Sequence, residues 1–394
     1  MNIPRAPGAP DQPPGGRSRA TGRPRPRDTI LRMRIAVDAR SLSGERTGVG
    51  RTLEGLYGAW TRLHPKDSVV LLSPRPISLP ATLEGRVEVR PPVRPRLPGT
   101  VWLQTLAPVE ALRARADLFH GPLGILPLAS LVPGVATIHD LTPLLFPGWH
   151  ETKNVAGFAP FLPGTVRRAA RLVCVSRATR DDLLLALPEA AGKAFVVPNG
   201  LVPPPPAGNG PPPHPRPFVL CIGTLEPRKN HERLVRAMES IWDRRPDFPD
   251  LVLAGGSGWG LPGFPERLSR SRHAARITRP GWVSPERAAA LLRGARLLAY
   301  PSLYEGFGLP ALEAMAEGIP VVASSSSSLP EVVGDAGLLP DPLDVGSIAS
   351  AIERANDDEA FRALARRRGP ERAALFTWEA AARQTRALFE EALS

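Results

Sequence analysis

The sequence contains little cysteine and no long apolar run. Its two cysteines, Cys174 and Cys221, both lie inside short apolar segments. This placement is typical of small core residues in a reducing compartment rather than of a disulfide or a metal pair. Because no stretch of about 18 apolar residues occurs, the sequence predicts no transmembrane helix. We therefore expect a cytoplasmic protein, with peripheral binding at the inner face of the membrane as the alternative.

Signs of nucleic-acid binding are also scarce. Aromatic residues make up 6% of the chain, and it contains no helix-turn-helix, zinc or RNA-recognition pattern. The formal net charge is nevertheless +12. A skewed genome composition and a soluble basic surface would account for this charge, and the functional alternatives are an anionic ligand or an anionic membrane surface. We expect no nucleic-acid partner; a basic tail with that role would be revealed by loss of binding when residues 1–32 are removed.

The chain is long enough for two domains of ordinary size. It has 394 residues, 42% of them hydrophobic, which is typical of a globular protein. Residues 1–32 are rich in proline, glycine and arginine and lack a signal core. They are predicted to be a disordered tail, with Met33 as an alternative translation start. Residues 203–217 are mostly proline, glycine and alanine, and they predict a semi-rigid linker.

Strand and helix patterns alternate on both sides of this linker. The alternation predicts an α/β protein with two doubly wound parallel-sheet domains, residues 33–202 and 218–376. Residues 377–394 are predicted to form a helix that packs back on the N-terminal domain.

Some individual elements are also predicted. Helices are expected at residues 51–63 and 101–114, and a short strand at residues 337–340. A further helix should begin at His231, with the side chain of Asn230 as its cap.

A glycine-rich loop at residues 304–313, Tyr-Glu-Gly-Phe-Gly-Leu-Pro-Ala-Leu-Glu, is the most informative stretch. Gly306 and Gly308 permit a tight turn and a close approach to a ligand. Pro310 suits the first turn of a helix, because its missing N–H would be unpaired there. Free N–H groups that lead into a helix N-terminus favour an anion.

Two carboxylates flank this loop, Glu305 and Glu313, and they are acceptors of the kind that sugar hydroxyls require. The alternative is an ordinary strand–turn–helix connection without a ligand. Buried strands are predicted on both sides, at residues 296–302 and 319–323. They place the loop at the carboxyl end of a parallel sheet, where α/β proteins bind ligands.

Three further sites follow predicted strands. Arg228 and Lys229 precede a helix, which suits a diphosphate, although a solvated pair of charges would look the same. His139 ends a buried strand at the same edge, where a structural histidine is the alternative. Gly48 and Gly50 lie where a loop enters a helix, which suits a ligand at the loop, and a tight turn without a ligand is the alternative. The spacing of these glycines does not match the dinucleotide-binding fingerprint.

Together these motifs resemble the retaining glycosyltransferases of the two-domain GT-B fold. The stretches Gly-Thr-Leu-Glu-Pro-Arg-Lys-Asn at 223–230 and Ser-Leu-Pro-Glu-Val-Val-Gly-Asp-Ala-Gly at 328–337 carry the likeness, together with the pair Glu305 and Glu313. The nearest group includes bacterial mannosyltransferases and sucrose synthase. The resemblance runs from about Met33 to the C-terminus and implies two Rossmann-like domains that face a central cleft.

The resemblance also implies roles. Glu313 would bind the ribose hydroxyls of a nucleotide sugar and Glu305 would contact the donor sugar. Lys229, with Arg228, would neutralise the diphosphate, and His139 would lie against the donor sugar.

Backbone groups in the glycine loop would hold phosphate and sugar, and backbone beside Trp282 would hold the base. The other donor-binding residues that the resemblance implies are Gly48, Gly50, Thr224, Val283, Phe307, Gly308 and Leu309. Thr224 is a departure, because many relatives carry an arginine there; Arg228 is the candidate to compensate.

The expected reaction follows from charge. The departing nucleoside diphosphate is an anion, which cations and helix N-termini stabilise. No Asp-x-Asp motif occurs, so we expect no metal and no cofactor beyond the nucleotide-sugar substrate. We expect a mannosyltransferase that uses GDP-mannose and a glycan or lipid-linked acceptor in polysaccharide biosynthesis. A UDP-sugar donor and a non-catalytic nucleotide-sugar-binding scaffold are the alternatives; loss of Lys229 or Glu305 would have favoured the scaffold.

Overall fold

The computed structural model describes residues 32–44, 48–92, 97–203, 205 and 214–394. The predicted tail, except residue 32, and most of the predicted linker lie outside these residues. Contacts divide the chain into two units, Met1–Leu31 and Arg32–Ser394, and the second contains both sheets.

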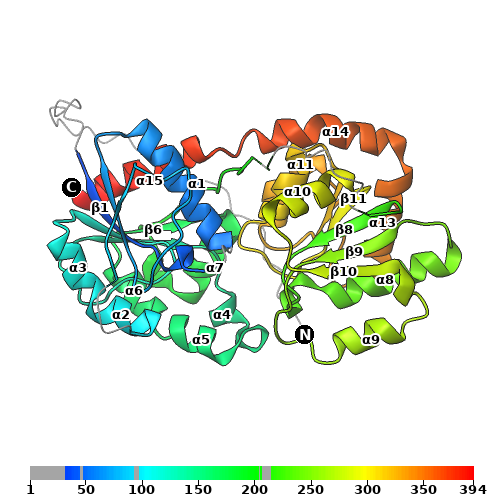
Figure 1. Ribbon diagram of the computed structural model, residues 1–394, viewed down its shortest axis with the longest axis horizontal. Helices are drawn as coiled ribbons and strands as arrows, with labels where there is room; N and C mark the ends of the chain where they lie inside the picture. The colour runs from blue at the N-terminus through cyan, green and yellow to red at the C-terminus, as the bar shows by residue number, and fades with distance from the viewer. Residues whose placement is uncertain (1–31, 45–47, 93–96, 204, 206–213) are drawn as a thin grey trace, which may run out of the picture. The chain divides into compact units, whose positions relative to one another are not determined.

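The first half of this unit is built on one parallel sheet with strand order β3-β2-β1-β4-β5-β6-β7. Every strand pair is parallel, so the carboxyl ends of the strands share one edge (Figure 1). The strands are β1 Arg34–Asp38, β2 Ser68–Leu72, β3 Glu88–Val89, β4 Leu118–Gly121, β5 Gly134–Ile138, β6 Arg171–Cys174 and β7 Ala194–Val196.

Helices cover both faces of this sheet because side chains alternate between its faces. Ile35 and Val37 of β1 pack with residues of α1 and α15, whereas Ala36 packs with residues of α2, α3 and α6. The helices are α1 Gly48–Leu63, α2 Gly99–Thr105, α3 Ala107–Arg113, α4 Thr142–Leu145, α5 Thr152–Phe158, α6 Leu162–Arg168 and α7 Arg177–Ala186, with 3₁₀ turns η1 Arg40–Leu42, η2 Pro147–Trp149 and η3 Pro188–Ala190.

The second half is built on another parallel sheet, with order β10-β9-β8-β11-β12. The expected α/β class with two parallel-sheet domains is therefore confirmed. The strands are β8 Phe218–Ile222, β9 Asp250–Ala254, β10 Ile277–Gly281, β11 Leu297–Tyr300 and β12 Val321–Ala323.

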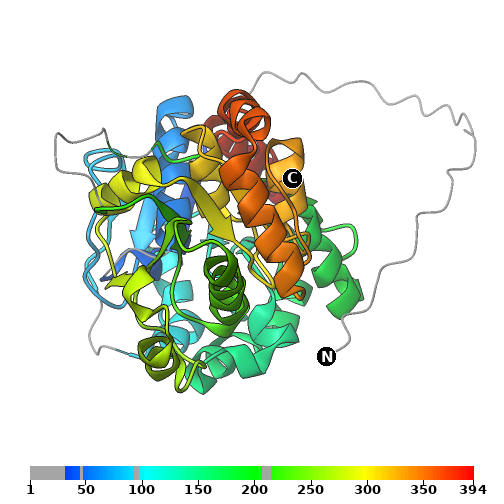
Figure 2. The same cartoon turned by 90° about the vertical axis from the view of Figure 1, so that its right-hand side faces the viewer.

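Helices lie on both faces of the second sheet as well (Figure 2). Val219 and Cys221 of β8 pack with residues of α8, α9, α13 and α14, and Phe218 and Leu220 with residues of α10, α11 and α12. The helices are α8 His231–Arg244, α9 Phe264–Arg270, α10 Pro285–Gly294, α11 Leu309–Ala316, α12 Leu329–Val333, α13 Val345–Asp357, α14 Glu359–Ala373 and α15 Trp378–Leu393, with 3₁₀ turns η4 Pro227–Lys229, η5 Ala274–Arg276 and η6 Gly334–Ala336.

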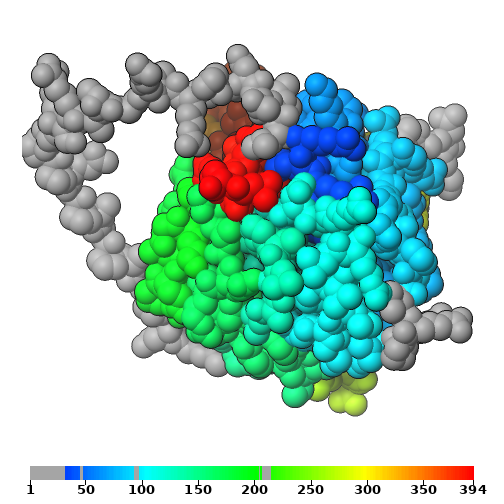
Figure 3. All heavy atoms as spheres, turned by 90° about the vertical axis from the view of Figure 1, so that its left-hand side faces the viewer, coloured from blue at the N-terminus to red at the C-terminus, as the bar shows by residue number. Residues whose placement is uncertain are grey.

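The last helix, α15, belongs to the core of the first sheet although it follows the second in sequence. It packs along α1 and contacts β5 and β6, and Figure 3 shows its red end beside the blue start of the first sheet. The buried ring of Trp378 fills a gap between two glycines. A Cβ built on Gly55 would lie 2.2 Å from this ring, and one on Gly200 would lie 2.2 Å from the Trp378 backbone nitrogen.

Several predicted elements are wrong in detail. The helix expected at 101–114 is two helices, because Pro108 has no N–H to continue the ladder of α2. Helix α1 begins at Gly48, so both glycines lie in its first turn. Residues 337–340 form no strand, and Leu338 makes only an isolated bridge to Val322.

Asn230 is not a side-chain cap either. It precedes α8 with a left-handed φ of 60° and makes no capping hydrogen bond. Its amide instead donates to the carbonyl oxygens of Pro301, at 2.9 Å, and Pro342, at 2.7 Å. Asn230 therefore ties the loop after β8 to the end of β11.

Candidate active site

Lys229, Arg228 and Glu305 form one buried cluster at the carboxyl ends of β8 and β11. Lys229 Nζ lies 2.6 Å from Glu305 Oε1, and Arg228 Nη1 lies 2.7 Å from Glu305 Oε2. Arg228 Nε also binds Glu226 Oε1, at 2.7 Å. The Glu305 side chain is only 7% exposed. The two cations and the carboxylate, which the sequence suggested for different parts of a donor, therefore lie side by side.

Burial and charge act in opposite directions on these groups. Burial alone would raise the pKa of Glu305, but the positive charges of Arg228 and Lys229 outweigh it and lower the pKa to about 2. Burial lowers the pKa of Lys229, and the positive charge of Arg228 lowers it further. The negative charge of Glu305 opposes this shift. Glu305 is thus an anion that holds the ends of two cations in fixed positions.

Lys229 retains capacity for a ligand. Two of its three N–H groups donate within the described part of the chain, one to Tyr300 Oη and one to Glu305 Oε1, each at 2.6 Å. The ammonium also lies 4.8 Å from the centre of the Tyr300 ring. The third N–H is available to an anion.

The serine run at residues 324–328 supports the glycine loop. Ser328 Oγ donates to the carbonyl oxygens of Glu305, at 2.8 Å, and Phe307, at 2.9 Å. Ser327 Oγ accepts from the backbone N–H of Glu305 at 2.9 Å. Gly308, with φ of 107°, leads into α11. Because these bonds fix the backbone, the position of the Glu305 carboxylate is defined by the loop as well as by its ion pairs.

His139 approaches this loop through its backbone. A Cβ built on Gly306 would lie 1.7 Å from the His139 carbonyl oxygen, so only glycine permits this contact. Thr179 Oγ1 lies 3.4 Å from the His139 carbonyl oxygen and 3.3 Å from that of Gly306. The loop after β5 and the loop after β11 are therefore joined at one place.

The surroundings of the His139 ring favour its neutral form. Its Nε2 donates to the carbonyl oxygen of Pro122 at 2.9 Å, because that oxygen can only accept. Burial is the main cause that lowers the pKa of His139. A neutral ring protonated at Nε2 leaves Nδ1 as an acceptor. The neighbouring Asp140 Oδ1 accepts from Thr142, which keeps that carboxylate in its own turn.

Glu313 lies on α11 and pairs with Arg51 of α1. The bond joins Glu313 Oε1 to Arg51 Nη2. Burial raises the pKa of Glu313, and the charge of Arg51 opposes that rise. The carboxylate predicted for ribose is thus already bound by a cation from the first half of the chain.

The remaining predicted residues are spread over four segments. Gly48 and Gly50 are in the first turn of α1, and Leu309 opens α11. The Phe307 ring is in the core, 5.6 Å from that of Phe376, so a ligand would meet the backbone of this residue and not its ring. Thr224 follows β8.

Val283 packs against the core of the second sheet, whereas the neighbouring Trp282 is 57% exposed. This exposed indole lies beside the backbone at which the base is expected.

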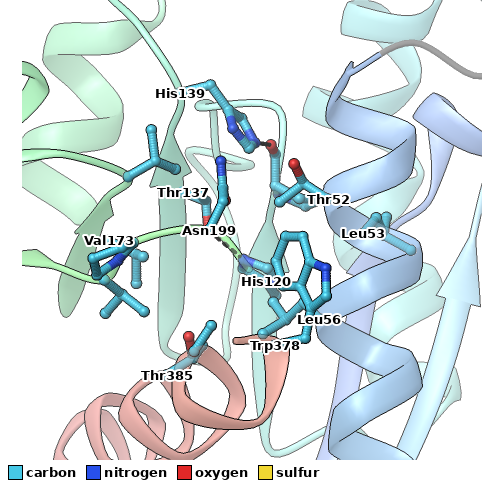
Figure 4. A pocket seen from close by; sticks show the side chains of 15 residues that line it. Thr52, Leu53, Leu56, His120, Thr137, His139, Val173, Asn199, Trp378 and Thr385 are labelled. Carbon is cyan, nitrogen blue, oxygen red and sulfur yellow. Dashed lines mark hydrogen bonds between the residues drawn. The ribbon is translucent and has the colours of Figure 1, made fainter. Parts of the chain in front are cut away.

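A small cavity lies below His139, between α1, β5 and α15 (Figure 4). Its volume is about 20 Å³, which suits a single water and is far too small for a sugar. Trp378 Nε1 lines this cavity and has no hydrogen-bond partner among the described residues. The cavity is a packing feature of the N-terminal core, not the place of a donor.

Sequence reasoning missed several residues that the structure brings to the site. Arg51 and Glu226 pair with predicted residues, and Tyr304 Oη donates to Asp182 Oδ2. Glu331 accepts from two backbone N–H groups at the start of α7. Position next to a predicted glycine was the available signal for Arg51, and Glu226 lies two residues before Arg228. The contacts of Tyr304 and Glu331 join segments far apart in sequence.

Within the residues that the structure describes, no helix is long and apolar enough to span a bilayer.

Family models match both halves of the chain. Residues 208–372 match the model described as glycosyl transferases group 1, and residues 46–203 match glycosyltransferase family 4. The O-antigen chain mannosyltransferase B of Escherichia coli is 35% identical over 70% of this chain and 74% of its own. The MMP alpha-(1→4)-mannosyltransferase of Mycolicibacterium hassiacum is 30% identical over 75% of this chain and 76% of its own.

Solved structures share the fold. Sucrose-phosphate synthase from Thermosynechococcus elongatus has a TM-score of 0.68 at 23% identity and covers 91% of this chain and 99% of its own. HepE of Anabaena, in complex with UDP and glucose, has a TM-score of 0.68 at 19% identity and covers 91% of this chain and 100% of its own. With relatives of this identity and coverage, and with family models on both sheets, the chain belongs to the GT-B glycosyltransferases of group 1 and family 4.

Proposed function

We propose that this glycosyltransferase moves mannose from GDP-mannose to a glycan or lipid-linked acceptor in polysaccharide biosynthesis, with retention at the anomeric carbon. The buried cluster of Lys229, Arg228 and Glu305 is the observation that carries the proposal. The names of the two mannosyltransferase relatives support the sugar and the pathway class.

The ammonium group of Lys229 explains how the cluster would act. When the bond between the sugar and the diphosphate breaks, negative charge grows on the departing phosphate. Lys229 has an N–H available on a group that Glu305 and Tyr300 already hold in place. A preorganised donor of this kind stabilises the developing charge without reorganising during the reaction.

Retention is proposed to occur by attack on the front face of the sugar. The bond from the anomeric carbon to the phosphate oxygen breaks, a bond to the acceptor oxygen forms on the same face, and the departing phosphate takes the acceptor proton. Glu305 is a poor candidate for a carboxylate nucleophile, because both of its oxygens are paired with cations. His139 would accept a hydrogen bond from the donor sugar through Nδ1.

A panel of nucleotide sugars tests the proposal. GDP-mannose, GDP-glucose, UDP-glucose and UDP-N-acetylglucosamine should be compared for binding and slow hydrolysis, and the anomeric configuration of the product determined by NMR. We expect GDP-mannose to be preferred and the configuration retained, with activity unchanged by a chelator. Inversion, or full activity loss with the chelator that added metal restores, would contradict the mechanism.

Two alternatives have definite outcomes in the same panel. Preference for a UDP-sugar would change the donor and leave the reaction class intact; the UDP bound to HepE makes this the second candidate. Tight binding without hydrolysis or transfer to any acceptor extract would favour a scaffold that binds nucleotide sugars.

We also propose that the basic surface binds anionic membranes that carry a lipid-linked acceptor. The net charge of +12 supports this. Binding to vesicles with phosphatidylglycerol should weaken as salt rises, because charges separated by more than about 10 Å are screened at 0.1 M salt. Vesicles of phosphatidylcholine alone are the control, and absence of binding to both at low salt would end the idea.

A further inference from the structure

Arg51 is a member of the site that neither a motif nor the proposed mechanism assigns. It lies in the first turn of α1, directly after Gly50, and its side chain is 37% exposed. Its Nη2 binds Glu313 Oε1 on α11. The pair joins residues 262 positions apart, one from each half of the chain. The pair occupies one oxygen of the carboxylate to which the family resemblance gives the ribose hydroxyls.

The charges around Glu305 leave room for another cation. Arg228 and Lys229 are positive, but Glu226 and Glu305 lie against them, so these four side chains bring no net charge. A nucleoside diphosphate carries about two or more negative charges at neutral pH. Arg228 is 19% exposed and paired on both sides, so it is fixed, whereas Arg51 is more exposed and has a long flexible stem.

We propose that Arg51 exchanges partners when a donor binds. Without a donor, its guanidinium covers Glu313. When the ribose hydroxyls take Glu313, Arg51 is released and binds the diphosphate of the same ligand. The inference rests on the proposed function, because it takes the ligand to be a nucleotide sugar.

The exchange predicts that the two parts of a nucleotide depend on each other. A nucleoside without phosphate breaks the ion pair and gives Arg51 nothing in return, so it binds poorly. A nucleoside diphosphate supplies the new partner, so its phosphates add more affinity than the fixed cluster alone would provide. Arg51 would thus act as a specificity residue for complete donors.

Calorimetry measures the affinity for a nucleoside and for its diphosphate, which report on the release from Glu313 and on the new contact. Guanosine and GDP are used, or uridine and UDP if the wild type prefers them. In Arg51→Ala we expect the nucleoside to bind about fivefold more tightly, since a partly exposed ion pair no longer competes. We expect the nucleoside diphosphate to bind about tenfold or more weakly, since a charged hydrogen-bond partner is lost. These opposite changes would not result from a merely structural defect.

Two further variants complete the test. Arg62→Ala removes an exposed arginine from the other end of α1, where it pairs with Glu379, and should change neither affinity. In Glu313→Gln the ion pair is already lost, so adding Arg51→Ala should no longer tighten nucleoside binding.

Each outcome has one meaning. Unchanged or weaker nucleoside binding in Arg51→Ala would overturn the release from Glu313, and unchanged diphosphate binding would overturn the new contact; either result rejects the exchange. If the wild type binds no nucleoside diphosphate at all, the proposed function itself fails.

Discussion

Gly306 and His139 are in direct backbone contact, and no Cβ can be placed between them. A Cβ on Gly306 would lie 1.7 Å from the His139 carbonyl oxygen and 3.2 Å from the Asp140 Cβ. This contact links the loop that carries Glu305 to the loop that carries His139. The distance between the two predicted catalytic groups is therefore set by the absence of a side chain at position 306.

Gly306→Ala should accordingly impair the reaction more than the fold. The backbones must separate, which costs about 1–3 kcal/mol of unfolding free energy in a well-packed contact. A displacement of about 1 Å in a catalytic constellation can reduce turnover about 100-fold. Gly148→Ala is the matched control, because a Cβ there meets nothing within 4 Å. Equal turnover in the two variants at saturating donor would show that the contact does not position the site.

The depressed pKa of Glu305 predicts how stability depends on pH. Its pKa is about 2 in the folded chain, against a usual value of 4.5. Because the folded pKa is the lower one, the carboxylate contributes stability above the unfolded pKa, and this contribution is lost as the pH falls from about 4.5 through about 2. The size is about 3 kcal/mol, taking about 1.4 kcal/mol per pKa unit.

Urea unfolding of Glu305→Gln and of the wild type at several pH values measures this contribution of the carboxylate to stability. The destabilisation by Glu305→Gln should be largest near neutral pH and should shrink as the pH falls from about 4.5 through about 2, because the wild-type carboxylate becomes protonated over this range. Glu189→Gln, which alters an exposed pair with Arg167 at 3.9 Å, is the control and should show no such trend. A destabilisation that stays constant over this pH range would argue against the ion pairs as its cause.

The contact between Gly55 and Trp378 predicts that glycine-to-alanine substitutions at two positions of α1 change the stability of the fold in opposite directions. In Gly55→Ala the new methyl group would meet the indole at 2.2 Å, which should displace α15 and cost about 1–3 kcal/mol. In Gly58→Ala, three residues later, the nearest atom is at 3.7 Å, so the gain in helix propensity of about 1 kcal/mol should dominate. Thermal unfolding should therefore shift down for the first variant and up for the second. A loss of stability in both would mean that α1 is packed more tightly than these distances indicate.

Local pattern explains most of what the sequence predicted correctly. Apolar strands with helices between them indicate two parallel sheets, because such strands must be buried on both faces. The glycine loop could also be recognised, since Gly308 is needed for its left-handed φ before α11.

The pattern could not indicate contacts between distant segments. The stretch with Arg228 and Lys229 and the loop with Glu305 are separate motifs in the sequence, yet in the structure the two cations pair with Glu226 and Glu305 in one cluster. The pair of Arg51 with Glu313 depends on how α1 and α11 are placed, which no periodicity encodes. The prediction that Asn230 caps α8 is wrong for the same reason. Asparagine is a common capping residue, but here its amide donates to the carbonyl oxygens of Pro301 and Pro342, which are distant in sequence.

The cluster at Glu305 leads to a prediction about turnover. Lys229 and Arg228 should act mainly on the transition state, because the charge on the diphosphate grows as the sugar bond breaks. An interaction that strengthens along this path lowers the barrier more than it tightens binding. Removing one preorganised donor typically costs on the order of 100–1,000-fold in turnover. Lys229→Ala should therefore lose far more turnover than donor affinity.

Arg228→Ala is the more informative variant, because the family resemblance leads us to expect a cation at the position of Thr224, which Arg228 would replace. Arg228 contacts Glu226 and Glu305, so its loss leaves two buried carboxylates with Lys229 alone. If Arg228 serves the diphosphate, turnover should fall nearly as far as in Lys229→Ala. Arg244→Ala, an exposed arginine on α8 that pairs with Glu353, is the control for the loss of a positive charge in the same domain. Near-normal turnover of a folded Arg228→Ala at saturating donor would contradict this role. Arg228 would then only hold the two carboxylates in place, and Lys229 would be the one cation of the cluster that acts on the leaving group.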